Sequence, residues 1–187
     1  MNAFRQIANL ISRGVVSLVN PGSQMQGLQM RLHADEVKDN MEHIEPYGFT
    51  AHPHPGAEGI ALFFAGDRSH GVVINVADRQ FRVAGLKAGE VAIYTDEKDT
   101  LIFKRGNVVE LTTKTFRVNA ETAVEVNTPT FTVNASSSVQ INTPETATTG
   151  RIVSTGDQIA AGVSQVNHPH QGVTKGLEQS GPPVVGA

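Results

Sequence analysis

Two histidines near the end of the chain, His168 and His170, have the residue type and the spacing of a metal-binding pair. Side chains on an extended strand alternate with a period of two, so both imidazoles of this His-Pro-His tripeptide are expected on the same side. One such pair supplies two nitrogens, which is too few for a buried transition-metal site. Three copies of the chain around a threefold axis would supply six.

Six neutral imidazoles would form an octahedral nitrogen cage, which suits a divalent transition metal. Zinc prefers four ligands in structural sites, so iron is favoured, and nickel stays open as an alternative. A saturated site of this kind has no open coordination position, although catalytic metals need one. The sequence therefore predicts a metal that joins three chain ends and no catalytic residue.

Two other sequence features are weaker candidates. Asp157 is the only acidic residue between the last repeat described below and the histidines. Three copies near an axis would repel each other unless they were hydrated or bridged by a cation, and oxygen ligands suit calcium. A surface aspartate in a Gly-Asp turn is an equal alternative. A second His-Pro-His, with His52 and His54, lies in a loop before a strand, where a solvated loop without bound metal is the favoured interpretation.

The case for a threefold axis comes from a repeat of 15 residues between Leu101 and Gly150. Residues 116–120 recur at 131–135, residues 126–129 recur at 141–144, and a degenerate earlier copy starts at Leu101. Apolar residues alternate within each copy, which predicts strands with one buried face. Because 15 is odd, the Asn-Thr-Pro step must be a corner that resets this alternation.

One copy of the repeat cannot be stable alone. It buries about four or five modest apolar side chains, each worth roughly 1.5–3 kcal/mol. Ordering the backbone costs about 1–2 kcal/mol per residue. Three chains wrapped together would supply the missing surface. A disordered linker is disfavoured, since linkers do not alternate so regularly.

The elements before the repeat predict a small barrel. Short apolar runs at residues 15–19, 28–32, 59–64 and 70–76 are separated by Gly/Pro turns, and about five strands would suit an OB-type barrel. Residues 3–13 predict a helix, with Phe4, Ile7, Ala8 and Ile11 on one face and Gly14 as its stop. This helix could pack on its own domain or dock on a larger assembly.

Composition excludes several classes of protein. The 187 residues include no cysteine and carry a formal net charge of −3, so disulfides and thiolate metal sites are absent and nucleic-acid binding is disfavoured. No apolar run approaches the roughly 18–20 residues needed to span a bilayer. The start of the chain lacks the apolar core of a signal peptide, so synthesis in the cytoplasm is expected.

Several segments of the chain resemble one family, the Mu-like baseplate assembly protein V family of central spikes in contractile phage tails. These are residues 45–50, 66–70 and 89–94, and the stretch from Gly156-Asp157 to Asn167-His168-Pro169-His170. The resemblance implies an N-terminal OB-fold, a trimeric intertwined β-helix, and an apex iron held by His168 and His170 of each chain. Family members also carry buried calcium and chloride ions, for which Asp157 is the one ligand suspected here. The His52–His54 tripeptide is not part of the family pattern.

Together, these features predict an all-β chain with four parts. They are an N-terminal helix at 1–13, an OB-fold domain with connecting strands at 14–100, triple-stranded β-helix repeats at 101–150, and a metal-binding apex with the C-terminal tail at 151–187.

The function that the resemblance implies is mechanical and non-enzymatic. A homotrimeric needle with one iron per trimer would sit in the baseplate of the virion, having been assembled in the host cytoplasm. It would contact other baseplate hub proteins and the tail tube, and would pierce the host outer membrane when the sheath contracts. Alternatives are the spike of a tail-derived bacteriocin or prophage remnant, and an OB-fold nucleic-acid-binding protein. A trimeric β-helix acyltransferase is disfavoured, because its six-residue repeat does not divide 15.

Overall fold

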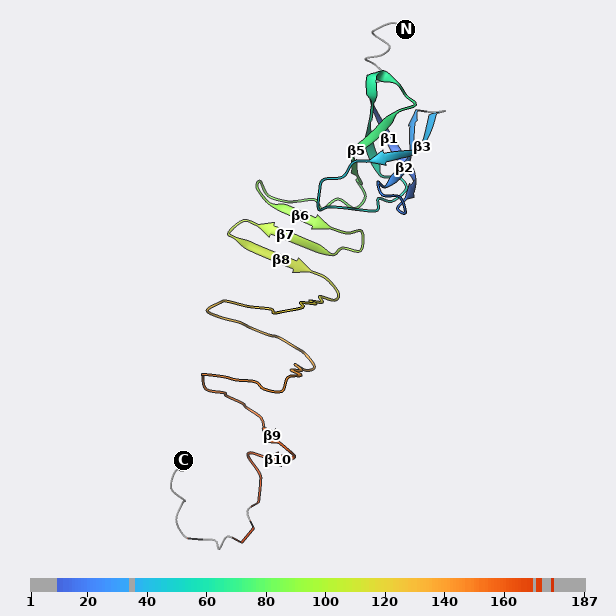
Figure 1. Cartoon of the computed structure of the whole chain (residues 1–187). Helices are drawn as coiled ribbons and strands as arrows, with labels where there is room; N and C mark the ends of the chain where they lie inside the picture. Colours follow the sequence, from blue (N-terminus) through green and yellow to red (C-terminus); the bar gives the residue numbers. More distant parts are fainter. Residues whose placement is uncertain (1–9, 34–35, 170, 173–175, 177–187) are drawn as a thin grey trace. The chain divides into compact units, whose positions relative to one another are not determined.

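The computed structural model describes residues 10–33, 36–169, 171–172 and 176. Within these residues the chain is all-β apart from one short 3-10 turn, η1 (Phe64–Gly66) (Figure 1). It divides into two units, Met1–Val124 and Glu125–Ala187. The described part holds no helix that is long and apolar enough to cross a membrane.

Five strands close into a barrel at the start of the first unit, as the sequence predicted. Strand β1 pairs antiparallel with β4, and β3 pairs parallel with β5, so the sheet has no free edge. The order around the barrel is β1 (Ile11–Asn20), β2 (Gly27–His33), β3 (Glu36–His43), β5 (Gly71–Ala77) and β4 (Glu58–Phe63).

Alternating apolar side chains of these strands fill the barrel. The largest fully buried ones are Phe63, Leu28, Met30, Val16 and Val73. The wall is closely packed where β1 passes β2. A Cβ atom on Gly14 would lie 2.7 Å from a methyl group of Leu32 and 2.8 Å from the Arg31 carbonyl oxygen, so that position requires glycine.

Arg68, in the connection between β4 and β5, ties three parts of the barrel together. Its guanidinium donates to both carboxylate oxygens of Glu36 on β3, over 2.7 and 2.5 Å, and to the Ser12 hydroxyl on β1 over 3.0 Å. It also lies 4.4 Å from the ring centre of Phe63. This bidentate contact lowers the pKa of Glu36 below its ordinary value.

The expected helix at residues 3–13 is wrong at its C-terminal end. Residues 1–9 lie outside the described part, and Leu10 forms a bend. Ile11, Ser12 and Arg13 begin β1, where they pair with Leu62, Ala61 and Ile60 of β4. A continuous ladder with β4 satisfies their backbone groups, and this tertiary pairing overrides the local helical spacing.

A second, three-stranded antiparallel sheet follows the barrel. It consists of β6 (Val91–Tyr94), β7 (Thr100–Lys104) and β8 (Val108–Thr112), so it crosses the domain boundary expected at residue 100. Strands β7 and β8 form a hairpin across Gly106 and Asn107, whose φ angles of 82° and 59° suit these two residue types.

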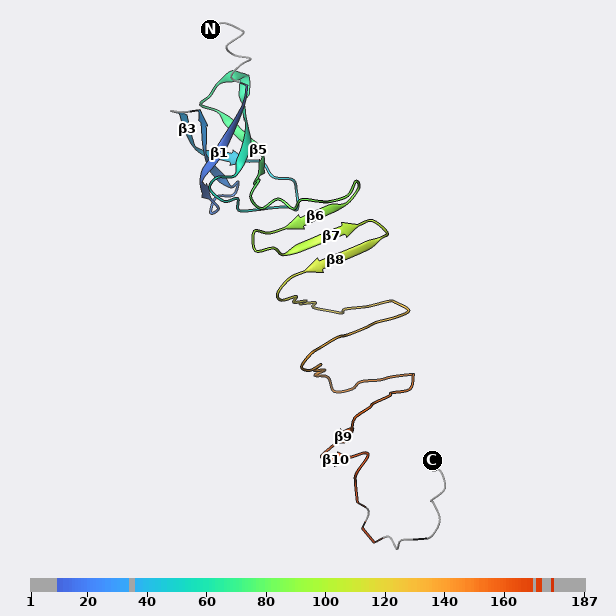
Figure 2. The same cartoon turned by 180° about the vertical axis from the view of Figure 1, so that it is seen from behind.

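The chain beyond β8 is extended but not hydrogen-bonded into a sheet. All residues between Thr112 and Ile159 are described, and none of them is in a strand (Figure 2). The second unit then forms a small hairpin of β9 (Ile159–Ala160) and β10 (Val163–Ser164). Positive φ angles at Ala161 and Gly162 make its two-residue turn.

Candidate metal centre and assembly surface

His168 follows the β9–β10 hairpin, and a backbone carbonyl holds its imidazole. Its Nδ1 lies 2.8 Å from the carbonyl oxygen of Ser164, and since a carbonyl only accepts hydrogen bonds, Nδ1 is the donor. A neutral imidazole with its proton on Nδ1 carries its lone pair on Nε2. His170, the predicted second ligand, lies outside the described residues, so the spacing of the pair stays a prediction.

His168, the described residue of the predicted pair, has the donor chemistry of a transition-metal ligand. Metal-bound histidines commonly donate their other ring N–H to a carbonyl or carboxylate, as His168 does to Ser164. Within the described residues of one chain, no three His, Asp or Glu side chains gather as a metal site would require. A metal at this end would therefore need ligands from further chains or from residues beyond the described part.

Asp157, the suspected calcium ligand, organises the hairpin in the single chain. The Ser164 hydroxyl donates to its carboxylate, and backbone N–H groups add further hydrogen bonds, of which the one from Val166 is 3.1 Å long. These contacts lower the pKa of Asp157 below its ordinary value. Ser164 was not predicted as a functional residue. The sequence offers only one indication of its role, namely its position four residues before His168.

Each 15-residue repeat turns at a hydroxyl corner, as its odd length predicted. Thr128 Oγ1 donates to the Thr130 carbonyl over 2.9 Å, and Thr143 Oγ1 makes the same 2.9 Å contact with the Glu145 carbonyl. One repeat earlier, Thr113 Oγ1 makes the equivalent contact with the Thr115 carbonyl over 3.4 Å. Such contacts define short turns that redirect the chain. Ser154 repeats the corner once more, which the sequence pattern did not reveal.

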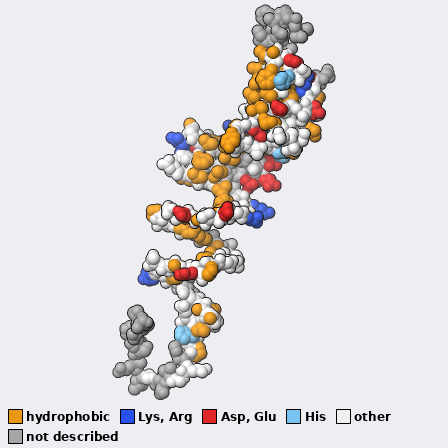
Figure 3. All heavy atoms as spheres, viewed as in Figure 1, with side chains coloured by type: hydrophobic (Ala, Val, Ile, Leu, Met, Phe, Trp, Pro, Cys, Tyr) orange, Lys and Arg blue, Asp and Glu red, His pale blue; other side chains and the backbone are white. Residues whose placement is uncertain are grey.

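Among the residues that the structure describes, the large apolar side chains of the repeats between positions 116 and 141 are more than half exposed. Phe116 and Phe131 are 70% and 72% exposed, as two members of a set spaced by 15 residues. The same set includes Val118, Val124, Val126, Val133, Val139 and Ile141. Figure 3 shows hydrophobic side chains at the surface along the extended part of the chain. Regular alternation of exposed apolar side chains is typical of a strand face whose partner is another chain.

The β6–β8 sheet shows how one repeat copy folds when its strands pair. Leu101 lies opposite Leu111, and Phe103 lies opposite Val109, so the four apolar residues of the degenerate first copy share one face. Phe103 and Val109 are nevertheless 47% and 59% exposed. Pairing within the chain therefore satisfies the backbone of this copy and still leaves its apolar face uncovered.

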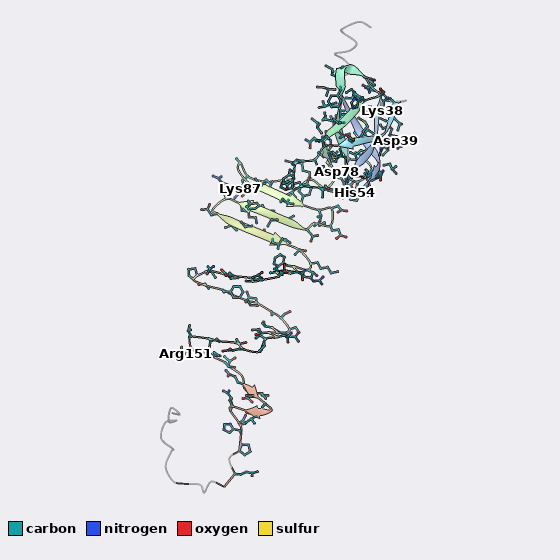
Figure 4. All side chains as sticks on the ribbon, in the orientation of Figure 1. Lys38, Asp39, His54, Asp78, Lys87 and Arg151 are labelled. Atoms are coloured by element: carbon teal, nitrogen blue, oxygen red, sulfur yellow. The ribbon has the colours of Figure 1, made fainter. Side chains whose placement is uncertain are left out.

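The other His-Pro-His has a different environment. His54 Nε2 lies 2.9 Å from Asp96 Oδ2, in the turn after β6, and its ring contacts Phe81. His52, His54 and Asp78 line an open pocket of about 630 Å³ between barrel residues and this turn. Figure 4 labels His54 and Asp78. The sequence assigned no role to His54, and a contact across 42 residues could not be read from it.

His43, on β3 beside the same pocket, is a buried titratable group. It is 7% exposed and lies 3.3 Å from the Gln26 side-chain oxygen, with Glu45 at 3.9 Å. Burial lowers the pKa of His43 below its ordinary value of 6.5, and the Glu45 carboxylate opposes this effect.

Acidification is expected to destabilise the barrel through His43. Because its pKa is lower in the folded state, the unfolded chain binds a proton first as the pH falls below 6.5. The free energy of unfolding should therefore drop from that pH toward the folded pKa, by at most about 1.4 kcal/mol per pH unit for one proton. Urea unfolding of wild type and His43→Gln from pH 8 to 5 checks this. An identical slope in the variant would contradict it.

The closed barrel, the three-stranded sheet and the extended repeats together define an all-β protein with a barrel near its N-terminus. Comparisons with known proteins agree with this class. Residues 13–80 match the family model of the Bacteriophage Mu Gp45 N-terminal domain.

Two relatives extend the match beyond the barrel. The chain is 32% identical over 172 residues to the Mu-like prophage FluMu protein gp45 of Haemophilus influenzae, covering 89% of each chain. It is also 31% identical over 118 residues to the baseplate puncturing device gp45 of Escherichia phage Mu, covering 63% of this chain and 60% of that one. The chain belongs to the Mu gp45 family, which confirms the resemblance noted from its motifs.

Proposed function

We propose that this protein is the central spike of a contractile tail baseplate, located in the virion. The observation that carries the proposal is the high exposure of the regularly alternating apolar residues between positions 116 and 141. A family relative bears the name of a baseplate puncturing device. The protein associates with other baseplate components and acts mechanically, without catalysis.

The working form is a homotrimer in which residues 101–150 of three chains intertwine into a triple-stranded β-helix. Two features support this arrangement. The backbone of residues 113–158 has no ladder within the chain, and the first repeat copy keeps its apolar face exposed even after it forms a hairpin. Neighbouring chains would supply both missing partners. The barrel order β1-β2-β3-β5-β4 supports an OB-type assignment for the N-terminal domain.

His168 and His170 of the three chains hold one iron at the apex. Support comes from the Nδ1 hydrogen bond of His168, which favours Nε2 as the ligand atom. The metal would supply a cross-link between chain ends that are too thin for a hydrophobic core. Calcium and chloride ions on the same axis belong to the proposal, with Asp157 as the candidate calcium ligand.

Piercing the host outer membrane requires a rod that does not splay under load. Backbone hydrogen bonds between chains would stiffen the repeats, and the apex metal would hold the ends together. The tail tube would deliver the force when the sheath contracts. The spike of a prophage remnant or of a tail-derived bacteriocin would work by the same mechanism.

The native mass and metal content of the full-length protein test this proposal. Three chains of 19.9 kDa give a particle of about 60 kDa, and elemental analysis should find one metal for every three chains. Antibody against the chain should label the baseplate in electron micrographs of particles. A monomeric protein, or label confined to another part of the particle, would contradict it.

A further inference from the structure

We propose that Asp157 and Ser164 are positioning residues for His168, and that their hydrogen-bond network sets which imidazole nitrogen faces the apex metal. This inference rests on the metal role proposed for His168. It assigns to Asp157 a task within each chain, different from bridging three chains through calcium.

The network begins at the Asp157 carboxylate, which lies just before β9. The Val166 N–H donates to Asp157 Oδ1 over 3.1 Å, which brings the chain after β10 back beside the start of the hairpin. The Ser164 hydroxyl donates to the same carboxylate. The carboxylate thus clamps both sides of the hairpin, because its acceptor oxygens receive donors from residues seven and nine positions further along the chain.

Ser164 connects the Asp157 carboxylate to His168 through its hydroxyl and its carbonyl group. Its Oγ accepts the Asn167 N–H over 2.7 Å while its O–H points to Asp157. Its carbonyl accepts the Nδ1–H of His168 over 2.8 Å. The hydroxyl and the carbonyl of one residue therefore fix both the backbone before His168 and the rotation of its ring.

The hydrogen bond to a carbonyl selects one tautomer. A ring with its proton on Nδ1 has its lone pair on Nε2, and only a nitrogen with a lone pair can bind a metal. Loss of the Nδ1–H contact with the Ser164 carbonyl would remove a constraint on both the tautomer and the rotation of the His168 ring. Supporting groups of this kind typically change metal affinity by about 10–100-fold when removed.

The first test uses the full-length protein after metal removal by a chelator, so it does not depend on the metal. In Asp157→Ala, hydrogen exchange of the Val166 and Asn167 amides should speed up by about tenfold or more, as for the loss of a charge-assisted hydrogen bond. The ring nitrogen shifts of ¹⁵N-labelled His168 should change from the Nδ1–H tautomer to a mixture. Glu145→Ala is the matched control, because it removes one carboxylate from a repeat in the same unit.

The second test follows metal loss from the loaded protein to an excess of chelator. Asp157→Ala and Ser164→Ala should lose metal about 10–100 times faster than wild type. Ser164→Thr, which keeps the hydroxyl, and Glu145→Ala should retain the wild-type rate.

Three results would overturn the inference. Unchanged exchange and tautomer in metal-free Asp157→Ala would show that the network does not order His168. Changed exchange with an unchanged rate of metal loss would show that the network orders the hairpin without positioning a ligand. A wild-type protein that binds no metal would overturn the metal role itself, and the exchange data would then still show separately whether the network exists.

Discussion

Phe131→Asp is expected to convert the assembled protein into single chains. Native mass spectrometry should show a shift from about 60 kDa to the 19.9 kDa of one chain, with the barrel still folded.

The physical reason is the position of Phe131 on the alternating apolar face. In one chain its side chain is 72% exposed, so in the proposed trimer it would become buried when the chains assemble. Burying a phenylalanine contributes roughly 1.5–3 kcal/mol per chain, and three chains lose this together. An unpaired carboxylate taken into the same interface adds a penalty of several kcal/mol for each chain.

Thr132→Asp provides the matched control, since side chains of adjacent residues in an extended chain point to opposite sides. The same charge one position away should leave the trimer intact. If both variants stayed trimeric, the exposed apolar face would not be the assembly surface. If both became monomeric, added charge alone would explain the effect, and the alternation would carry no information about the interface.

The barrel could be predicted from sequence only where its strands alternate in the usual way. The runs at 15–19, 28–32, 59–64 and 70–76 all fall within or overlap observed strands. Strand β3 was missed because Glu36–His43 is mostly charged and polar, with only Met41 and His43 buried. Its place in the sheet comes from pairing with β2 and β5, which no local pattern contains.

In the repeats, the turns could be predicted from the sequence but the pairing of the strands could not. Their corners could be predicted, because an odd period needs a turn and Pro129 and Pro144 mark it. Whether the strands of each copy pair within the chain could not be predicted from the sequence. Gly106 and Asn107 close a tight hairpin in the first copy, whereas the later copies have Glu121 and Ser136 at the position of Gly106 and form no ladder within the chain.

The His-x-His spacing made His168 a candidate ligand but gave no sign of what orients its ring. The clamp depends on Asp157 and Ser164 meeting across a hairpin, and the hairpin depends on positive φ angles at Ala161 and Gly162. An aspartate near a suspected metal site suggests a cation ligand when only the sequence is known. The hydrogen bonds that the carboxylate accepts give it a structural task as well.

Replacing His168 and His170 together by alanine is expected to abolish the bound metal. Wild type should hold one metal per three chains, and the double variant should hold none by elemental analysis. Six imidazole nitrogens supply all the ligands of the proposed site, so no partial site remains. The variant should stay trimeric, because the apolar faces of the repeats lie elsewhere in the chain. Its C-terminal segment should become more sensitive to proteases, since the cross-link between the three ends is gone.

The chain contains its own matched control in the other His-Pro-His. His52→Ala with His54→Ala removes the same two residue types at the same spacing, and also the 2.9 Å contact of His54 with Asp96. This variant should keep the full metal content. Equal metal in wild type and in the His168/His170 variant would refute the apex assignment. Loss of metal only in the His52/His54 variant would move the site to the barrel pocket. The two tripeptides differ only in what surrounds them, so the pair of variants tests whether assembly or spacing makes a histidine pair a metal site.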